Sequence, residues 1–204
     1  MGKGARARQQ RAAREAAGVS MHGLARLRRL TNLVGDYWEG QAQCIEGVAL
    51  LCRTAALDGY QLQPCAVAVA VQGSTGSAAL GARAGEAFGW DFPPGLNGWD
   101  TAGHLIATLD RPAHVFDPTL SQVSPKTGLP ELVIAEPVDT LTPVSGTFDF
   151  TVAGCGIRYY LEPEDQTWGT RYTEQYEACA LVAQDLLDAL NAGPNAQIYK
   201  EPRA

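Results

Sequence analysis

Three residues whose types can together activate a thiol occur in a fixed order along the chain: Cys44, His104 and Asp117. Cys44 lies in "EGQAQCIEGVALLCRTAALDGY", where a helix is expected to begin. His104 opens an expected strand in "GWDTAGHLIATLD", and Asp117 lies on the following strand in "VFDPTLSQ". A cysteine becomes an effective nucleophile when a histidine accepts its proton and a carboxylate orients that histidine. The three residues therefore predict a nucleophile, a base and an orienting group.

The expected position of Cys44 at a helix N-terminus favours the same chemistry. The positive end of the helix dipole and an adjacent imidazolium both lower the pKa of a thiol below its usual value of about 8.5. The backbone N–H of Cys44 would point toward the oxyanion that forms when a carbonyl group is attacked. A side-chain amide could complete that oxyanion site, and either Gln41 or Gln43 could supply it.

The pairing of His104 with Asp117 depends on a β-hairpin that the sequence predicts around the loop "DRPA". If these four residues form the loop, Leu109 pairs with His114 and His104 lies opposite Thr119. Side chains alternate along a strand, so Asp117 then lies on the same face as His104. A loop with an odd number of residues would send the two side chains to opposite faces.

Two helices and a strand are expected before the hairpin. Leucines at helical spacing in "MHGLARLRRLTNLVGDYW" predict a helix that Gly35 and Gly40 interrupt. A second helix is expected to run from Ala42 to a stop at Gly59. The apolar run "PCAVAVAVQG" predicts a strand covered on both faces. Residues 73–100, rich in Gly, Ser and Pro, are interpreted as a long surface connection.

After the hairpin, "SGTFDFTVAGCGIRYYLEP" predicts two strands joined by a glycine-rich turn, and "TEQYEACALVAQDLLDALNAG" predicts one closing helix. Together these elements predict an α+β domain over residues 21–193, with an N-terminal nucleophile helix packed on an antiparallel sheet. Residues 1–20 are expected to form a basic, disordered arm, and residues 194–204 a loose tail.

Other residues could take the place of the histidine or the carboxylate. His114 is the alternative base, but at the turn end of the hairpin it would lie away from Asp117. Asp100 and Asp110 are the alternative carboxylates. Asp110 falls in the expected turn, however, and Asp100 precedes the strand.

Tryptophans border the segments that carry the candidate residues. Trp38 precedes Cys44, and Trp90 and Trp99 flank the long connection. These side chains could form an aromatic rim that holds a substrate, or they could cover the core.

Composition limits the class of protein. The chain has 204 residues, 46% of them hydrophobic, and no apolar run of the roughly 18 residues that a membrane span needs, which favours one globular domain and no membrane. Five cysteines without Cys-x-x-Cys spacing argue against a disulfide framework and a structural zinc site, and Cys52 and Cys179 fall within apolar helical stripes. Neither a metal-binding nor a phosphate-binding motif occurs, so no metal and no other cofactor is expected.

Charge is distributed unevenly along the chain. Residues 1–30 carry a net charge of +7, whereas the remainder carries −13. The arginine-rich start could tether the protein to nucleic acid or another anionic surface. It could also be a solubilising tail, which the acidic remainder favours. The start lacks the apolar core of a secretory signal, so a cytoplasmic location is expected.

The run "CIEGVALLCRTAALDGYQLQPCAVAVAV", followed by a strand-opening histidine and then "VFDPT", resembles the papain-like thiol enzymes in their transglutaminase and arylamine N-acetyltransferase arrangement. The resemblance covers residues 37–122. It implies a papain-like or transglutaminase-like fold with Cys44 as nucleophile, His104 as general base and acid, and Asp117 as the group that fixes the imidazole tautomer. No Trp follows Cys44, as in many transglutaminases, and no Arg-Gly-Gly-x-Cys opening precedes it, as in the acetyltransferases.

Two classes of function follow. The first is thiol-dependent acyl chemistry on a peptide, amide or other acyl substrate through a covalent acyl-enzyme. Water as the acceptor gives a peptidase or amidase, and an amine gives an acyltransferase; hydrolysis is favoured because no cofactor motif is present. The second class is a non-catalytic interaction protein that keeps this fold and binds a partner or nucleic acid through its basic arm. The oligomeric state is left open.

Overall fold

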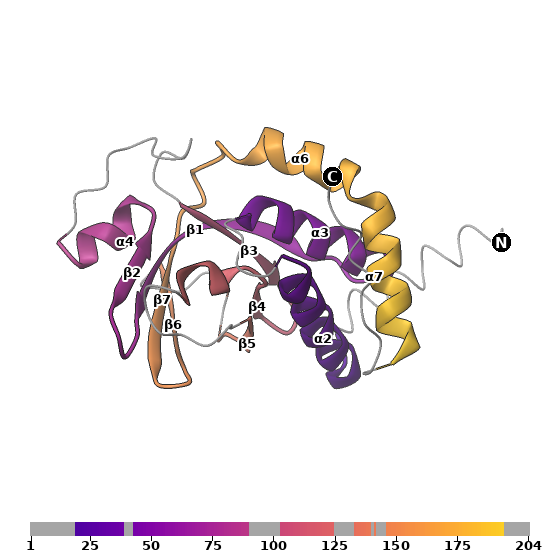
Figure 1. Cartoon of the computed structure of the whole chain (residues 1–204), viewed down its shortest axis with the longest axis horizontal. Coiled ribbons are helices and arrows are strands. Elements are labelled where there is room, and N and C mark those ends of the chain that lie inside the picture. Colours follow the sequence, from indigo (N-terminus) through magenta and orange to yellow (C-terminus); the bar gives the residue numbers. More distant parts are fainter. Residues whose placement is uncertain are drawn as a thin grey trace.

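The computed structural model describes residues 19–38, 43–89, 103–124, 133–139, 141 and 146–193, in which helices pack against a curled antiparallel sheet (Figure 1). The chain is of the α+β class, as expected. The elements in chain order are α2 (Met21–Trp38), α3 (Cys44–Leu57), β1 (Gln63–Gln72), β2 (Ser77–Leu80), α4 (Ala82–Ala87), β3 (His104–Leu109), β4 (His114–Asp117), the 3₁₀ helix η2 (Leu120–Val123), β5 (Ile134–Pro137), β6 (Thr147–Val152), β7 (Cys155–Leu161), α6 (Gly169–Ala178) and α7 (Ala180–Ala192). The expected tail and nearly all of the expected arm lie outside the described residues.

Strand β1 is the centre of the sheet, whose order is β5-β4-β3-β1-β7-β6 with β2 added beside β1. The first half of β1 pairs with β3 as far as Val67, which is opposite His104. The second half pairs with β2 from Val69 onward, on the edge opposite β7. His104 therefore lies where β1 changes partner, at the first residue of the interior strand β3.

The sequence of β1 explains why both of its faces are covered. Valines and alanines alternate, so that Val67 and Val69 join an apolar cluster on one face of the sheet. On the other face, Ala66 packs with the cluster that contains α3, and Ala68 packs with α4. The small alanine side chains let the helices approach the strand closely, which confirms the expectation of a strand covered on both sides.

Helix α3, which begins at Cys44, is the best anchored helix near the site. It contacts α2, α6, α7 and β3, and Figure 1 shows these helices gathered on one side of the sheet. Val48, Leu50 and Leu51 are at most 1% exposed. Burying each large apolar side chain contributes roughly 1.5–3 kcal/mol, which holds the helix start in a fixed position.

The expected interruption of the first helix at Gly35 is wrong, because α2 continues to Trp38. A Cβ atom at position 35 would lie 2.7 Å from Val133 Cγ2 and 3.1 Å from the carbonyl oxygen of Pro118. Glycine is thus used here for close packing of α2 against the segment after β4. Gly40 lies outside the described residues.

The expectation of a single closing helix is also wrong, because this segment forms two helices, α6 and α7, that divide at Cys179. The backbone at Cys179 (φ −84°, ψ 10°) bends the chain. The bend lets α6 lie on α3 while α7 contacts both α2 and α3 (Figure 1). The apolar spacing continues through the bend, so the sequence pattern alone did not indicate it.

The long surface connection contains more structure than expected. Residues 77–80, "SAAL", form β2, which extends the sheet beside β1. Residues 82–87 form α4. A Cβ atom at Gly103 would lie 2.2 Å from the backbone nitrogen of Gly81, so two backbones cross closely just before His104. The absence of a side chain at Gly103 permits this close approach.

The two hairpins follow the expected pattern. Strands β3 and β4 pair with Leu109 opposite His114, the register that a four-residue loop requires. Strands β6 and β7 are joined by Ala153 (φ 50°) and Gly154 (φ 78°), a two-residue turn with positive φ at both positions.

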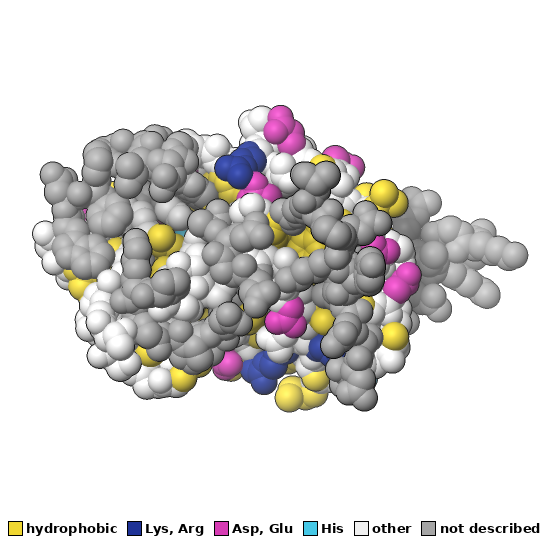
Figure 2. All heavy atoms as spheres, viewed as in Figure 1, with side chains coloured by type: hydrophobic (Ala, Val, Ile, Leu, Met, Phe, Trp, Pro, Cys, Tyr) yellow, Lys and Arg dark blue, Asp and Glu magenta, His cyan; other side chains and the backbone are white. Residues whose placement is uncertain are grey.

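On the face shown in Figure 2, the acidic and basic side chains of the described residues are scattered and do not form a single patch. Over the described ranges, none of the helices combines the length and the apolar character that a bilayer crossing requires.

Candidate functional site

The imidazole of His104 and the carboxylate of Asp117 form a fully buried pair. His104 Nε2 lies 2.7 Å from Asp117 Oδ2, and both side chains are 0% exposed. The contact follows from the register of the β3–β4 hairpin, which places the two side chains diagonally on one face of the sheet.

Asp117 is held by donors on both carboxylate oxygens. The hydroxyl of Tyr159 on β7 donates to Oδ2 at 2.8 Å, so Tyr159 and His104 share one oxygen. The backbone N–H of Thr119 donates to Oδ1 at 3.0 Å, and the Thr119 hydroxyl lies 3.4 Å from the same atom. A carboxylate bound in this way cannot rotate, and it fixes the ring of His104 in turn.

The surroundings of His104 favour its charged form. Burial lowers the pKa of His104, but the charge and hydrogen bond of Asp117, together with those of Cys44, outweigh burial and raise the pKa from 6.5 to about 10. Cys44 is therefore a close neighbour of the His104 ring. The structure therefore brings together all three residues that the sequence singled out.

Cys44 begins α3 and is only partly buried, unlike Cys52 and Cys155. Asp117 occupies Nε2 of His104, which leaves Nδ1 as the nitrogen that can exchange a proton with the thiol. The first N–H groups of α3 receive no cap from the side chain of Gln43. These N–H groups are donors beside the sulfur, as an oxyanion site requires.

Gln122 on η2 is a further polar neighbour of the ring. Its Nε2 lies 2.9 Å from His104 Nδ1, the nitrogen opposite the Asp117 contact. The backbone of η2 is anchored by Leu120 and Val123, which are 0% and 2% exposed. Both ring nitrogens of His104 are thus hydrogen-bonded.

Two glycines let the helices close onto the segment that follows Asp117. A Cβ atom at Gly47, one turn after Cys44, would lie 2.5 Å from Thr119 Cγ2 and 3.6 Å from Pro118 Cγ. Gly35 makes the corresponding close approach from α2 to the Pro118 carbonyl. The distance between the Cys44 helix and the Asp117 strand is therefore set by residues without side chains.

The first turn of α3 is also tied to α6. Arg171 Nε donates to Glu46 Oε1 at 2.9 Å, and Arg171 Nη2 contacts the same oxygen. Glu46 is 8% exposed, so this ion pair is desolvated on one side. It fixes the helix start against α6, two residues from Cys44.

The other sequence candidates have varied positions. Trp38 is partly buried, and its Cδ1 would contact a Cβ atom at Gly47, so it lies beside the first turn of α3. Gln43 is the N-cap residue of α3. Gln41, Trp90 and Trp99 lie outside the described residues.

The alternative base and carboxylate do not join the cluster. His114 donates through Nδ1 to the Pro112 carbonyl oxygen at 3.1 Å, so it bonds within the turn. Asp110 is exposed and pairs with Arg111 at 3.4 Å. Asp100 lies outside the described residues.

Sequence reasoning missed Tyr159, Gln122 and Thr119. Tyr159 carries a usable signal, because alternate residues of β7 face the core and a buried tyrosine hydroxyl needs a partner. Burial and the neighbouring Asp117 raise the pKa of Tyr159 well above 10, so it remains a donor. No comparable pattern marks Gln122.

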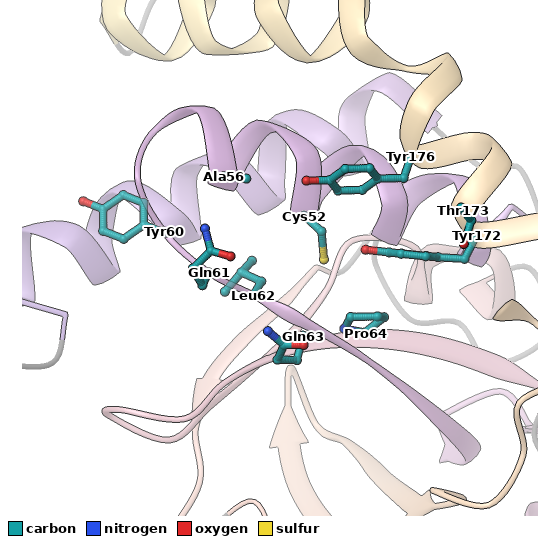
Figure 3. Close-up of a pocket in the computed structure, with 10 residues that line it drawn as sticks. All are labelled: Cys52, Ala56, Tyr60, Gln61, Leu62, Gln63, Pro64, Tyr172, Thr173 and Tyr176. Carbon is teal, nitrogen blue, oxygen red and sulfur yellow. The ribbon is translucent and has the colours of Figure 1, made fainter. Parts of the chain in front are cut away.

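A separate pocket of about 340 Å³ lies further along α3 (Figure 3). Cys52 points into it from α3, and Tyr172 and Tyr176 of α6 form another wall. Burial raises the pKa of Cys52 to about 12, even though a hydrogen bond from Tyr172 lowers it. The Cys52 thiol is thus protonated at neutral pH and lacks the partners that Cys44 has.

All five cysteines are free thiols. Within the described ranges, no cluster of His, Cys, Asp and Glu could hold a metal ion. In comparisons with known proteins, no family model, no curated protein and no solved structure matches this chain significantly.

Proposed function

We propose that this protein is a thiol-dependent hydrolase or acyltransferase that works through Cys44, His104 and Asp117. The observation that carries the proposal is the buried His104–Asp117 hydrogen bond beside the partly buried Cys44 that opens α3. A carboxylate that is held through both of its oxygens keeps the imidazole in one orientation. A catalytic base needs that fixed orientation throughout a reaction.

The proposed reaction runs through the ion pair in which the Cys44 proton is on His104 Nδ1, the charge state of the ring that Asp117 and Cys44 favour, and Cys44 Sγ then attacks a carbonyl carbon. Asp117 holds the proton on Nε2 and stabilises the imidazolium that results. The N–H groups at the start of α3 receive the negative charge that develops on the carbonyl oxygen. The carbon–leaving-group bond then breaks, and the Nδ1 proton passes to the leaving group, which leaves an acyl-enzyme.

The acyl-enzyme is released by water or by an amine. Neutral His104 takes the proton of the incoming nucleophile at Nδ1, and the Cys44 thiolate leaves. We favour peptides, amides and activated esters as substrates and water as the acceptor. Trp38, which lies beside the first turn of α3, offers an apolar surface to such a substrate.

A papain-like or transglutaminase-like architecture is part of the proposal. It is supported by the chain order of Cys44, His104 and Asp117 and by an α+β fold with the cysteine at the start of a helix beside an antiparallel sheet.

The test is acylation of the full chain by p-nitrophenyl acetate under single-turnover conditions, with the acetylated residue identified by mass spectrometry. We expect acetyl-Cys44, loss of the p-nitrophenol burst in Cys44→Ala, and a reduction of about 100-fold or more in His104→Ala and Asp117→Asn. Cys52→Ala is the matched control on the same helix. A full burst in Cys44→Ala would exclude this mechanism.

A non-catalytic interaction protein is the second candidate, and one observation favours it. Gln122 occupies His104 Nδ1, the position to which the thiol proton must move. If Gln122 blocks that nitrogen permanently, Cys44 reacts with iodoacetamide no faster than Cys179, which is also partly buried. Faster alkylation of Cys44 that depends on His104 excludes the binding-only function.

A further inference from the structure

Gln122 and Cys44 compete for one atom. Asp117 Oδ2 accepts a hydrogen bond from His104 Nε2. In the neutral ring, Nε2 therefore carries the proton and Nδ1 carries the lone pair. In this neutral form Gln122 Nε2, 2.9 Å away, can donate to that lone pair, whereas in the imidazolium, which the raised pKa of His104 favours at neutral pH, it cannot. The Cys44 proton has the same destination, because Nδ1 is the only ring nitrogen left to receive it.

Proton transfer changes what the amide can do. Once the thiol proton is on Nδ1, this nitrogen becomes a donor and can no longer accept a hydrogen bond from Gln122. The amide N–H must then turn to a new acceptor. The atoms that gain negative charge at this moment are Cys44 Sγ and, after attack, the carbonyl oxygen bonded to the carbon that Sγ has reached.

We infer that Gln122 is a catalytic residue that donates its side-chain N–H to the oxyanion of the tetrahedral intermediate, released for this purpose when His104 takes the Cys44 proton. The inference rests on the proposed acyl chemistry at Cys44. The electrons balance within one cycle: the sulfur lone pair forms the S–C bond, the carbonyl π pair moves to oxygen, and the proton moves to Nδ1. Collapse of the intermediate expels the leaving group with that proton, and Gln122 returns to the restored Nδ1 lone pair.

The position of Gln122 supports this role. The turn η2 begins three residues after Asp117, and the Gln122 backbone N–H bonds to the Thr119 carbonyl oxygen at 3.2 Å. Thr119 itself binds Asp117, so the amide and the carboxylate are positioned by one short segment. Gln122 therefore approaches the reacting atoms from the strand side, whereas the N–H groups of α3 approach from the helix side.

This assignment differs from the oxyanion donors that the sequence suggests, Gln41 and Gln43, which precede the nucleophile. Gln43 is the N-cap residue of α3, and its side chain makes no cap hydrogen bond. Gln122, by contrast, lies 2.9 Å from the reacting nitrogen. Substitution of each of the three glutamines in turn therefore distinguishes which of them donates to the oxyanion.

The experiment compares two reactions of Cys44 that differ in the need for an oxyanion site. Alkylation by iodoacetamide proceeds by displacement of iodide and forms no oxyanion, whereas acylation by p-nitrophenyl acetate does. For Gln122→Ala we expect acylation to fall about 100-fold while the alkylation rate stays within about threefold. Gln122→Glu, which is nearly isosteric but cannot donate, should lose acylation equally. Gln184→Ala, on the exposed face of α7, is the matched control.

The outcomes separate the inference from the proposed function. Equal losses of alkylation and acylation in both Gln122 variants would overturn the inference, because Gln122 would then only position His104. Unchanged acylation would overturn it as well, and a loss in Gln43→Ala would assign the donor to that residue. Failure of the wild-type chain to be acylated at Cys44, or equal alkylation of Cys44 and Cys179, would defeat the proposed function itself.

Discussion

Gly47 and Thr119 approach so closely that a Cβ atom on Gly47 would lie 2.5 Å from Thr119 Cγ2. Thr119 is β-branched and donates to Asp117 through its backbone, so it has little freedom to move aside. The contact therefore couples the Cys44 helix to the carboxylate that orients His104. A side chain at position 47 would displace both.

Replacement of Gly47 by alanine is expected to separate Cys44 from His104. Helix propensity alone would favour alanine by up to about 1 kcal/mol, but the overlap with Thr119 costs about 1–3 kcal/mol, so the free energy of unfolding should fall. The p-nitrophenyl acetate rate should fall more than stability does. Gly169→Ala is the control, since a Cβ there meets no atom within 4 Å. Equal effects of the two substitutions would contradict the role given to Gly47.

Tyr159→Phe removes one donor from Asp117 Oδ2 while keeping the ring. Loss of this buried hydrogen bond should reduce the free energy of unfolding by about 1–2 kcal/mol. Negative charge then concentrates on the oxygen that binds His104, so the pKa of His104 should rise. NMR titration of the imidazole measures the shift. Tyr160→Phe, the next residue along β7, changes a hydroxyl that makes no contact with Asp117 and should leave the His104 pKa in place.

The raised pKa of His104 predicts the alkaline limit of the reaction. Asp117 and Cys44 raise it from 6.5 to about 10, so the imidazolium present below pH 6.5 persists through neutral pH and is lost as the pH rises through about 10. A rate that needs the imidazolium as general acid should fall over the same range. In Cys44→Ala the His104 pKa should be lower, because the thiol's hydrogen bond and charge are gone. An unchanged His104 titration in that variant would show that the two side chains do not interact.

Alkylation at neutral pH should distinguish Cys44 from the buried thiols. Burial raises the pKa of Cys52 to about 12 and that of Cys65 to about 11, so neither ionises appreciably at pH 7. Brief treatment with iodoacetamide followed by peptide mass spectrometry should label Cys44 first. Early labelling of Cys52 would mean that the packing of α3 against α6 opens in solution.

The pairing of His104 with Asp117 could be predicted from the sequence because it depends only on a local property, the even length of the loop between two strands. Tyr159 could not be placed in this way. It reaches Asp117 because β7 pairs with β1, whose other neighbour is β3, and this strand order is non-local.

The errors in the predicted helices have a related cause. Glycine weakens an isolated helix, so the sequence indicates an interruption at Gly35. In the structure Gly35 lies within α2, where the close approach of Pro118 and Val133 leaves no room for a side chain. The bend at Cys179 was missed because apolar spacing is preserved through it, and only the packing of α6 and α7 on different neighbours reveals it.

The order in which the site is completed has a consequence for biosynthesis. Cys44, His104 and Asp117 leave the ribosome well before Tyr159, whose strand must insert beside β1 to close the hydrogen bonds around the carboxylate. Under the proposed function, a nascent or partly unfolded chain therefore lacks the complete set of hydrogen bonds that orients His104 for Cys44, and pairing of β7 with β1 completes the activation of the thiol.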